Sequence, residues 1–241
     1  MRHPSPVPAL LTDPTHPSLA RALRSLAEMK RRALLVTGDP VRAGLEVIES
    51  EIPWAGIVEH EDRNRSNMFL STGLVDKLTQ EELIAVMGHE WAHVAEKLGW
   101  GEWALKGAAL IGSVGFHLTV VSLLMNTSAA GLALGVLCLL MTLGFMALCL
   151  GLEGHASRAQ ELTCDRFAAR LVGARSMVST LRRVDGVMRR HHGLPAVKPP
   201  AMPLSLRSGW RRLRMWHARS HPAVEDRVMH ISRYRHRLLR A

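Results

Sequence analysis

The stretch "VMGHEWAHVAEK" (residues 86–97) places His89 and His93 four residues apart, with Glu90 directly after the first histidine. Residues i and i+4 of a helix lie on one face, so both imidazoles can bind one metal ion, and Glu90 can accept a proton from water on that ion. Imidazole ligands with one open position are typical of catalytic Zn²⁺. The alternative is an amphipathic helix whose polar residues face water.

A helix is needed to hold this histidine pair, and the preceding residues predict one. Thr79 followed by Glu82 forms a capping box, in which the threonine caps backbone N–H groups and the glutamate reaches back. We expect the helix to run from there to about Leu98 and to end at Gly99. His89 and His93 then lie in mid-helix.

Composition leaves several classes of partner open. The chain has 241 residues and a formal charge of +10, which suits nucleic acid, an anionic membrane surface or acidic partners equally well. Its three cysteines, without a closely spaced pair, argue against a disulfide framework and a cysteine zinc site. The N-terminus lacks an apolar core of signal-peptide length, so we expect no export by that route.

Two apolar runs, residues 107–125 and 132–152, contain no formal charge. Each approaches the ~20 residues that cross a hydrocarbon core, and the short turn between them predicts a helical hairpin over residues 107–152. The alternative is a pair of buried helices in a soluble core. Lys106 and Arg158 flank the hairpin on one side, which indicates the cytoplasmic face of the inner membrane for both flanks of a multi-pass protein.

The N-terminal third predicts a loose lead-in, residues 1–53, with a helix at 18–33 and another short helix at 41–50. Two extended segments follow, "WAGIVE" (54–59) and "NMFLST" (67–72). The polar turn between them predicts a small antiparallel hairpin.

The C-terminal half predicts a helix at 157–172, a loop at 193–205, and a basic helical segment at 206–241 whose last helix starts at His221-Pro222. Arginines alternate with two tryptophans in "SGWRRLRMWHARS" (208–220). Such a tail could bind nucleic acid. Beside a membrane hairpin we expect contact with anionic headgroups instead, and no nucleic-acid partner.

A third metal ligand does not follow the histidine pair in the metzincin manner, because Glu96 and Gly99 occupy the positions that would need glycine and histidine. After the hairpin, Glu161 and Asp165 are four residues apart and share a helical face. One carboxylate can bind the metal while the other orients a ligand histidine. The alternative is a solvated acidic pair among neighbouring arginines.

These motifs occur in an order that resembles the HtpX-like membrane metallopeptidases of family 48, which are related to the CaaX-processing zinc proteases. The resemblance covers about residues 54–236 and rests on the histidine motif, the hairpin and two later motifs. The matching positions are His89, Glu90 and His93; Ser157, Arg158, Glu161 and Asp165; and His221, Pro222 and Arg227.

The resemblance implies one Zn²⁺ per chain, with Glu161 as third ligand beside His89 and His93, and Glu90 as catalytic base. It also implies that His221 and Arg227 approach the metal site from the C-terminal helix, where a donor can stabilise an oxyanion. Substrates would be proteins or peptides, including misfolded membrane proteins, and the strand at 67–72 is our candidate edge for binding an extended peptide.

We therefore expect a mainly α fold with a small antiparallel β-sheet. It is a zincin-type metallopeptidase domain, residues 54–236, with a transmembrane hairpin inserted between the zinc-ligand helices. The expected function is that of an endopeptidase anchored in the lipid bilayer, acting at the cytoplasmic membrane face. The alternatives are a catalytically silent membrane scaffold or sensor and a basic nucleic-acid module. The sequence does not predict an oligomeric state.

Overall fold

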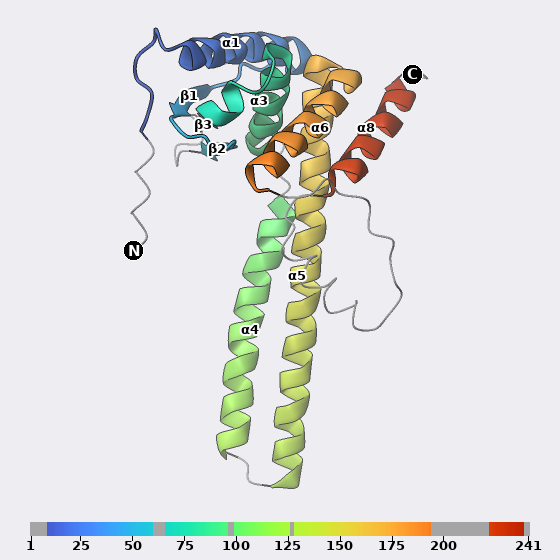
Figure 1. The fold of residues 1–241 in the computed structure, drawn as a ribbon. Helices are drawn as coiled ribbons and strands as arrows, with labels where there is room; N and C mark the ends of the chain where they lie inside the picture. Colours follow the sequence, from blue (N-terminus) through green and yellow to red (C-terminus); the bar gives the residue numbers. More distant parts are fainter. Residues whose placement is uncertain (1–8, 60–65, 96–98, 126–127, 194–221, 239–241) are drawn as a thin grey trace. The chain divides into compact units, whose positions relative to one another are not determined.

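The computed structural model describes residues 9–59, 66–95, 99–125, 128–193 and 222–238 (Figure 1). The chain divides into two units. The sheet unit comprises Met1–Lys97, Glu161–Pro203 and Pro222–Ala241, and the hairpin unit comprises Leu98–Gln160 and Leu204–His221. Helix α5, Ala129–Val172, is continuous and contributes residues to both units.

The sheet unit contains all three described strands and most of the helices. In chain order these are α1 (Pro17–Thr37), β1 (Ala43–Ile48), β2 (Ala55–Glu59), β3 (Ser66–Ser71), α2 (Thr72–Val75), α3 (Gln80–Ala95), the end of α5, α6 (Ala174–His191) and α8 (Val224–Leu238). The predicted helix at 18–33 is confirmed by α1. Helix α6 carries no predicted element, although buried Met177 and Leu181 lie on one of its faces.

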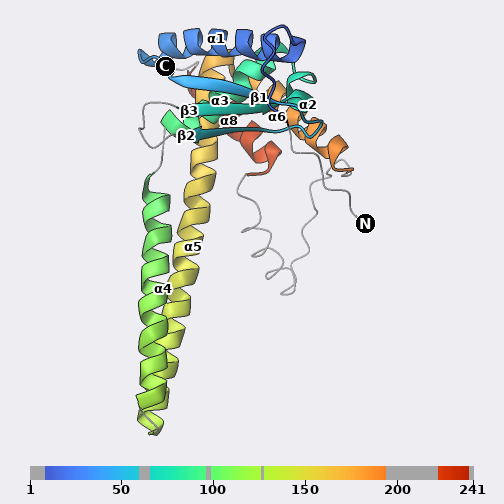
Figure 2. The same cartoon turned by 90° about the vertical axis from the view of Figure 1, so that its left-hand side faces the viewer.

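The sheet is mixed, in the order β1-β3-β2 (Figure 2). β2 and β3 are antiparallel, which confirms the predicted hairpin, whereas β1 is parallel to β3. The expectation of a purely antiparallel sheet is therefore wrong. So is the short helix at 41–50, because Ala43 and Val47 are buried while Gly44, between them, is exposed, and such alternation fits a strand.

The position of β3 overturns a further expectation. The segment at 67–72 was expected to be an edge strand, but β3 pairs with β1 on one side and β2 on the other. The outer side of β1 is bonded to the N-terminal segment, through Leu11 N–H to the Val47 carbonyl at 2.8 Å. Within the described sheet, the edge without a further strand is therefore that of β2.

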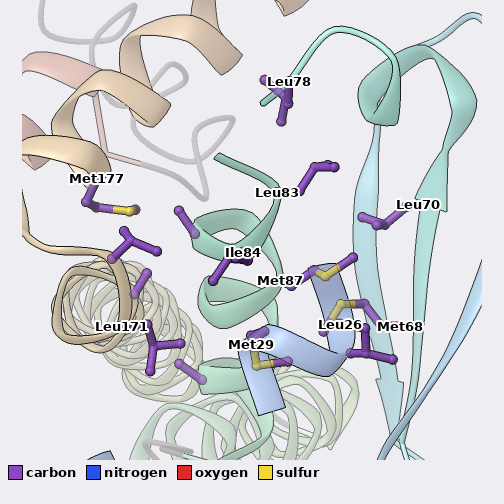
Figure 3. Close-up of a cluster of buried hydrophobic side chains, with 14 of the residues drawn as sticks. Leu26, Met29, Met68, Leu70, Leu78, Leu83, Ile84, Met87, Leu171 and Met177 are labelled. Atoms are coloured by element: carbon purple, nitrogen blue, oxygen red, sulfur yellow. The ribbon is translucent and has the colours of Figure 1, made fainter. Parts of the chain in front are cut away.

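Helices cover one face of the sheet and enclose the core with it. Buried side chains come from α1, β3, α3, α5 and α6, and ten of them are labelled in Figure 3: Leu26, Met29, Met68, Leu70, Leu78, Leu83, Ile84, Met87, Leu171 and Met177. Because α3 lies between the sheet, α1 and α6, one of its sides is packed throughout. The helix that carries the two histidines is thus fixed in place.

The end of α5 approaches α3 closely at Gly88. A Cβ atom placed on Gly88 would lie 2.6 Å from Leu171 Cδ1 and 3.7 Å from the Ala168 backbone. A side chain here would force the two helices apart or displace Leu171. Gly88 therefore sets the spacing of α3 and α5 one residue before the first histidine.

Among the described residues, the hairpin unit contains α4, Gly99–Met125, and the first part of α5, which lie side by side in both cartoons (Figures 1 and 2). Both predicted apolar runs are helical. Among the described residues, one helix, Ala130–Val172, is long and apolar enough to cross a membrane, and a shorter apolar stretch covers Ala109–Val121.

Gly88 generates a prediction about packing. Replacing Gly88 with valine should cost about 1–3 kcal/mol, because the added carbons have no space against Leu171. For a chain of this size each kcal/mol lowers Tm by roughly 2–4 °C, which thermal unfolding in detergent can measure. Gly186→Val on α6 is the matched control, since the nearest outside atom to a Cβ there is Arg190 Nη1 at 3.8 Å. Equal Tm values for the two variants would contradict the assigned contact.

Candidate metal centre

Three side chains from two helices converge in the sheet unit. His89 and His93 lie one turn apart on α3, and Glu161 comes from α5. The two Nε2 atoms are 3.2 Å apart. Glu161 places Oε2 3.4 Å from His89 Nε2 and Oε1 3.3 Å from His93 Nε2. His89 and Glu161 are buried, and His93 is half-buried.

This spacing suits one metal ion. In a tetrahedral zinc site with bonds of about 2.0–2.1 Å, neighbouring ligand atoms are separated by about 3.3–3.4 Å. The three distances agree with that value within about 0.1 Å. Two imidazole nitrogens and one carboxylate oxygen are also a donor set that zinc peptidases use, with a fourth position left open. The residues present therefore fit a zinc ion.

The start of α3 is fixed by the predicted capping box. The Thr79 N–H donates to Glu82 Oε2 at 2.8 Å, and the Glu82 N–H donates to Thr79 Oγ1 at 3.3 Å. Reciprocal bonds of this kind satisfy backbone donors that a helix start leaves without partners. The cap fixes where α3 begins and hence which face the two histidines share.

Asp165 lies one turn after Glu161 and contacts His89 at Nδ1, the ring nitrogen that does not face the ligand cluster. Its Oδ1 is 2.9 Å from His89 Nδ1. Arg227, on α8, donates to the same carboxylate through Nε at 2.7 Å and Nη2 at 2.5 Å. When Nδ1–H of neutral His89 donates to Asp165, the lone pair of Nε2 is directed to the ligand cluster. The carboxylate thus selects the tautomer that metal binding requires.

Proton affinities in the cluster follow from this geometry. Burial lowers the pKa of His89, but the hydrogen bonds with Asp165 and Glu161 outweigh burial and raise it to about 9. Burial raises the pKa of Asp165, yet Arg227 and His89 hold it below its usual value. Because only neutral imidazole binds a metal, an incoming ion must displace the His89 proton.

The remaining predicted residues are distributed as follows. Glu90 is half-buried on α3, next to His89. Arg227 is half-buried and directed at Asp165, with Nη1 3.9 Å from Glu161 Oε2. His221 lies outside the described residues, so its role stays a prediction. The ligand and catalytic roles of the others also stay predictions, now with a defined geometry.

One contributor to the site was missed at the level of sequence. Gly88 is part of the quoted stretch, but a glycine inside a helix attracts notice only as a weak helix former. The signal was its position after the apolar stretch 83–87 and immediately before His89, where close approach of another helix is useful.

The metal-ligand geometry predicts distinct effects of two carboxylates. Glu161→Ala should abolish stoichiometric zinc binding, since it removes one of three ligands. Asp165→Asn should weaken zinc binding about 10–100-fold, because it acts on His89 orientation. Metal content and competition with a chromophoric chelator measure both. Asp185→Ala on α6, which removes one ion pair of Arg189, is the control and should keep wild-type affinity. Full zinc occupancy in Glu161→Ala would refute this ligand set.

The chain is similar in sequence to known peptidases. The model of Peptidase family M48 matches residues 60–235. The protease HtpX homolog of Acidovorax ebreus is 29% identical over 211 residues, covering 79% of this chain and 68% of the relative. That of Bordetella pertussis is 30% identical over 173 residues, covering 69% and 56%. The chain thus spans from about half to two thirds of the length of these relatives.

A solved structure shows the same fold. The crystal structure of Ste24p from S. mikatae superposes with a TM-score of 0.55 at 18% identity, covering 84% of this chain and 49% of Ste24p. The resemblance expected from the ordered motifs is confirmed by the family match over 60–235, a range that includes the histidine pair, Glu161 and Arg227. The chain belongs to peptidase family M48.

Proposed function

We propose that the protein is a membrane-anchored zinc endopeptidase. The observation that carries this proposal is the triangle of His89, His93 and Glu161, whose ligand atoms have the mutual spacing of a tetrahedral zinc site. The neighbouring Glu90 supplies a carboxylate on the same helix. Membership of family M48 supports peptide-bond hydrolysis as the reaction.

Each residue at the site has a separate proposed role in catalysis. Glu90 accepts a proton from the attacking water and passes it to the leaving amine. Asp165 and Arg227 hold His89 in the tautomer that presents Nε2. A bound Zn²⁺ would supply Lewis acidity, polarising the scissile carbonyl and lowering the pKa of water to ~7. His221 is proposed as a donor to the developing oxyanion.

The substrate would lie along β2. Because β3 is central, the edge that can accept an extended peptide in the described sheet is that of β2, which packs against α3. Main-chain hydrogen bonds to an edge strand hold a peptide extended, whatever its side chains are. An extended backbone exposes its carbonyls to a neighbouring metal centre, which is what hydrolysis requires.

The hairpin is proposed to anchor the chain in a bilayer. Its outward side chains are large and apolar, among them Leu110, Phe116, Leu137 and Leu148. Small residues meet at its helix–helix seam: a Cβ on Gly115 of α4 would collide with Thr142 of α5. Small residues inside and apolar residues outside are the arrangement expected in lipid, where the surroundings are as apolar as leucine.

Basic flanks orient the hairpin. Lys106 precedes it and Arg158 follows it, so we place both flanks and the metal centre on the cytoplasmic side of the inner membrane. Misfolded or partly extracted membrane proteins are the proposed substrates. A site beside the bilayer meets such chains, and the curated relatives are named as HtpX proteases.

Catalysis is tested by Glu90→Gln. This change keeps the side-chain shape but removes the proton acceptor, so hydrolysis of a casein-type substrate should fall by about 10²–10⁴-fold while zinc content is unchanged. Metal analysis and cleavage are measured on the same detergent-purified sample. Glu81→Gln, on the first turn of the same helix, is the control and should retain activity. Near-normal proteolysis by Glu90→Gln would remove Glu90 from the mechanism.

The anchor is tested by cysteine labelling in intact cells. In a background with Cys138, Cys149 and Cys164 replaced by alanine, a cysteine at the exposed Ser128 should react with an impermeant reagent added outside, because the connection between α4 and α5 is proposed to lie on the far side of the membrane. A cysteine at Thr37, on the sheet unit, should react only after permeabilisation. Labelling of Thr37→Cys in intact cells would invert the proposed topology.

A further inference from the structure

The face of the sheet opposite the core carries a small apolar surface on β2. Side chains alternate along a strand, so Ala55 and Ile57 pack toward the core while Gly56 and Val58 lie on the other face. Trp54, just before β2, lies on that outer face too. Trp54 is 41% exposed and Val58 55% exposed, so both side chains are available to a partner on this face.

Trp54 is held in a defined position. Its backbone N–H donates to Ser71 Oγ at 2.8 Å. Its indole contacts Phe69 of β3 edge-on, with ring centroids 6.2 Å apart and ring planes at 69°. Ser71 is itself fixed, because its hydroxyl also accepts from the Leu74 N–H at the start of α2. The backbone at Trp54 is therefore fixed, and its indole forms an aromatic wall beside Phe69 on the outer face.

Gly56 leaves a gap between this wall and Val58. A Cβ on Gly56 would lie 3.7 Å from the nearest atom of the Trp54 indole, so any larger side chain would fill the space beside the ring. The three positions 54, 56 and 58 thus form a row of aromatic wall, gap and aliphatic side chain. This row follows the outer face of the edge strand.

A peptide paired with β2 would place every second side chain against this row. Directly opposite residues of paired strands have Cβ atoms about 5 Å apart, and diagonal neighbours remain within reach of an aromatic ring. The side chain opposite Gly56 would enter the gap between Trp54 and Val58. The peptide residues between these positions would direct their side chains to the opposite face of the sheet.

We propose that Trp54, Gly56 and Val58 form a specificity subsite that selects an apolar or aromatic side chain at alternate positions of an extended substrate. This rests on the proposed peptidase function and on pairing along β2. A charged or strongly polar side chain is disfavoured there because it would lose water against the indole without gaining a partner. The preferred substrates are extended segments of apolar residues.

The test uses a series of quenched fluorescent peptides that are identical except for a single leucine moved through a serine- and threonine-rich background. With the wild-type enzyme, kcat/KM should alternate with period two on moving the leucine, with maxima about tenfold above minima. Trp54→Ala should reduce this alternation to less than about twofold. Gly56→Val raises strand propensity but fills the gap, and should also reduce the alternation to less than about twofold.

Binding is measured separately from turnover. Zinc-loaded Glu90→Gln with and without Trp54→Ala is titrated with the same labelled peptides by fluorescence polarisation, and the loss of preference should reappear in Kd. Leu35→Ala on α1 is the control, since Leu35 is 73% exposed but lies on a different element. It should leave both the alternation and Kd unchanged.

The outcomes distinguish the two proposals. If the wild type cleaves the peptides and its alternation persists in Trp54→Ala and Gly56→Val, the subsite proposal is overturned. The proposed peptidase function is then unaffected. Zinc-loaded wild type that neither binds nor cleaves any peptide overturns the proposed function, and the subsite with it. Binding without alternation refutes pairing of an extended chain along β2.

Discussion

The shared hydrogen bonding of Asp165 is the interaction on which the metal centre depends. This carboxylate has no solvent exposure, and it is bonded to Arg227 on one side and to His89 on the other. A buried charge without a partner is costly, and removing one member of such a pair costs about 3–5 kcal/mol. The three groups are therefore stable only together, and α3, α5 and α8 must meet for the cluster to form.

That constraint links residues that are far apart in the chain. Arg227 lies 62 residues after Asp165, and the hairpin unit separates His93 from Glu161. Two features make the meeting possible. Gly88 lets the end of α5 approach α3, and α5 runs without a break from its apolar part into the turn that carries Glu161. The proposed carboxylate ligand, Glu161, is thus carried on a helix rather than on a loop.

Large apolar side chains are mainly buried in the sheet unit and mainly exposed in the hairpin unit. In the sheet unit, leucine and methionine fill an interior that helices and one face of the sheet enclose, as expected in water. In the hairpin unit, leucine and phenylalanine point outward, and glycine and threonine line the seam. Apolar burial cannot stabilise a seam of that kind in water, whereas close packing of small residues is effective in lipid. This contrast supports the anchoring role proposed for the hairpin.

Local sequence determined the features that depend on neighbours along the chain. The capping box, the helix bearing His89 and His93, the apolar helices and the antiparallel pair of strands follow from short-range spacing and hydrogen bonding. The proposed roles of Glu161 as third ligand and of Arg227 were assigned only through the ordered family motifs, because no local rule relates position 161 or 227 to position 89.

Tertiary structure alone decided the rest. It showed that 43–48 is a strand, because Val47 and Ala43 gain burial only by pairing with β3. It made β3 central and β2 the edge, since strand order depends on contacts between segments distant in sequence and not on the pattern within each. It also set the 3.2–3.4 Å spacing of the ligand atoms, which arises from the approach of α5 to Gly88 and from a buried charge that must find its partners.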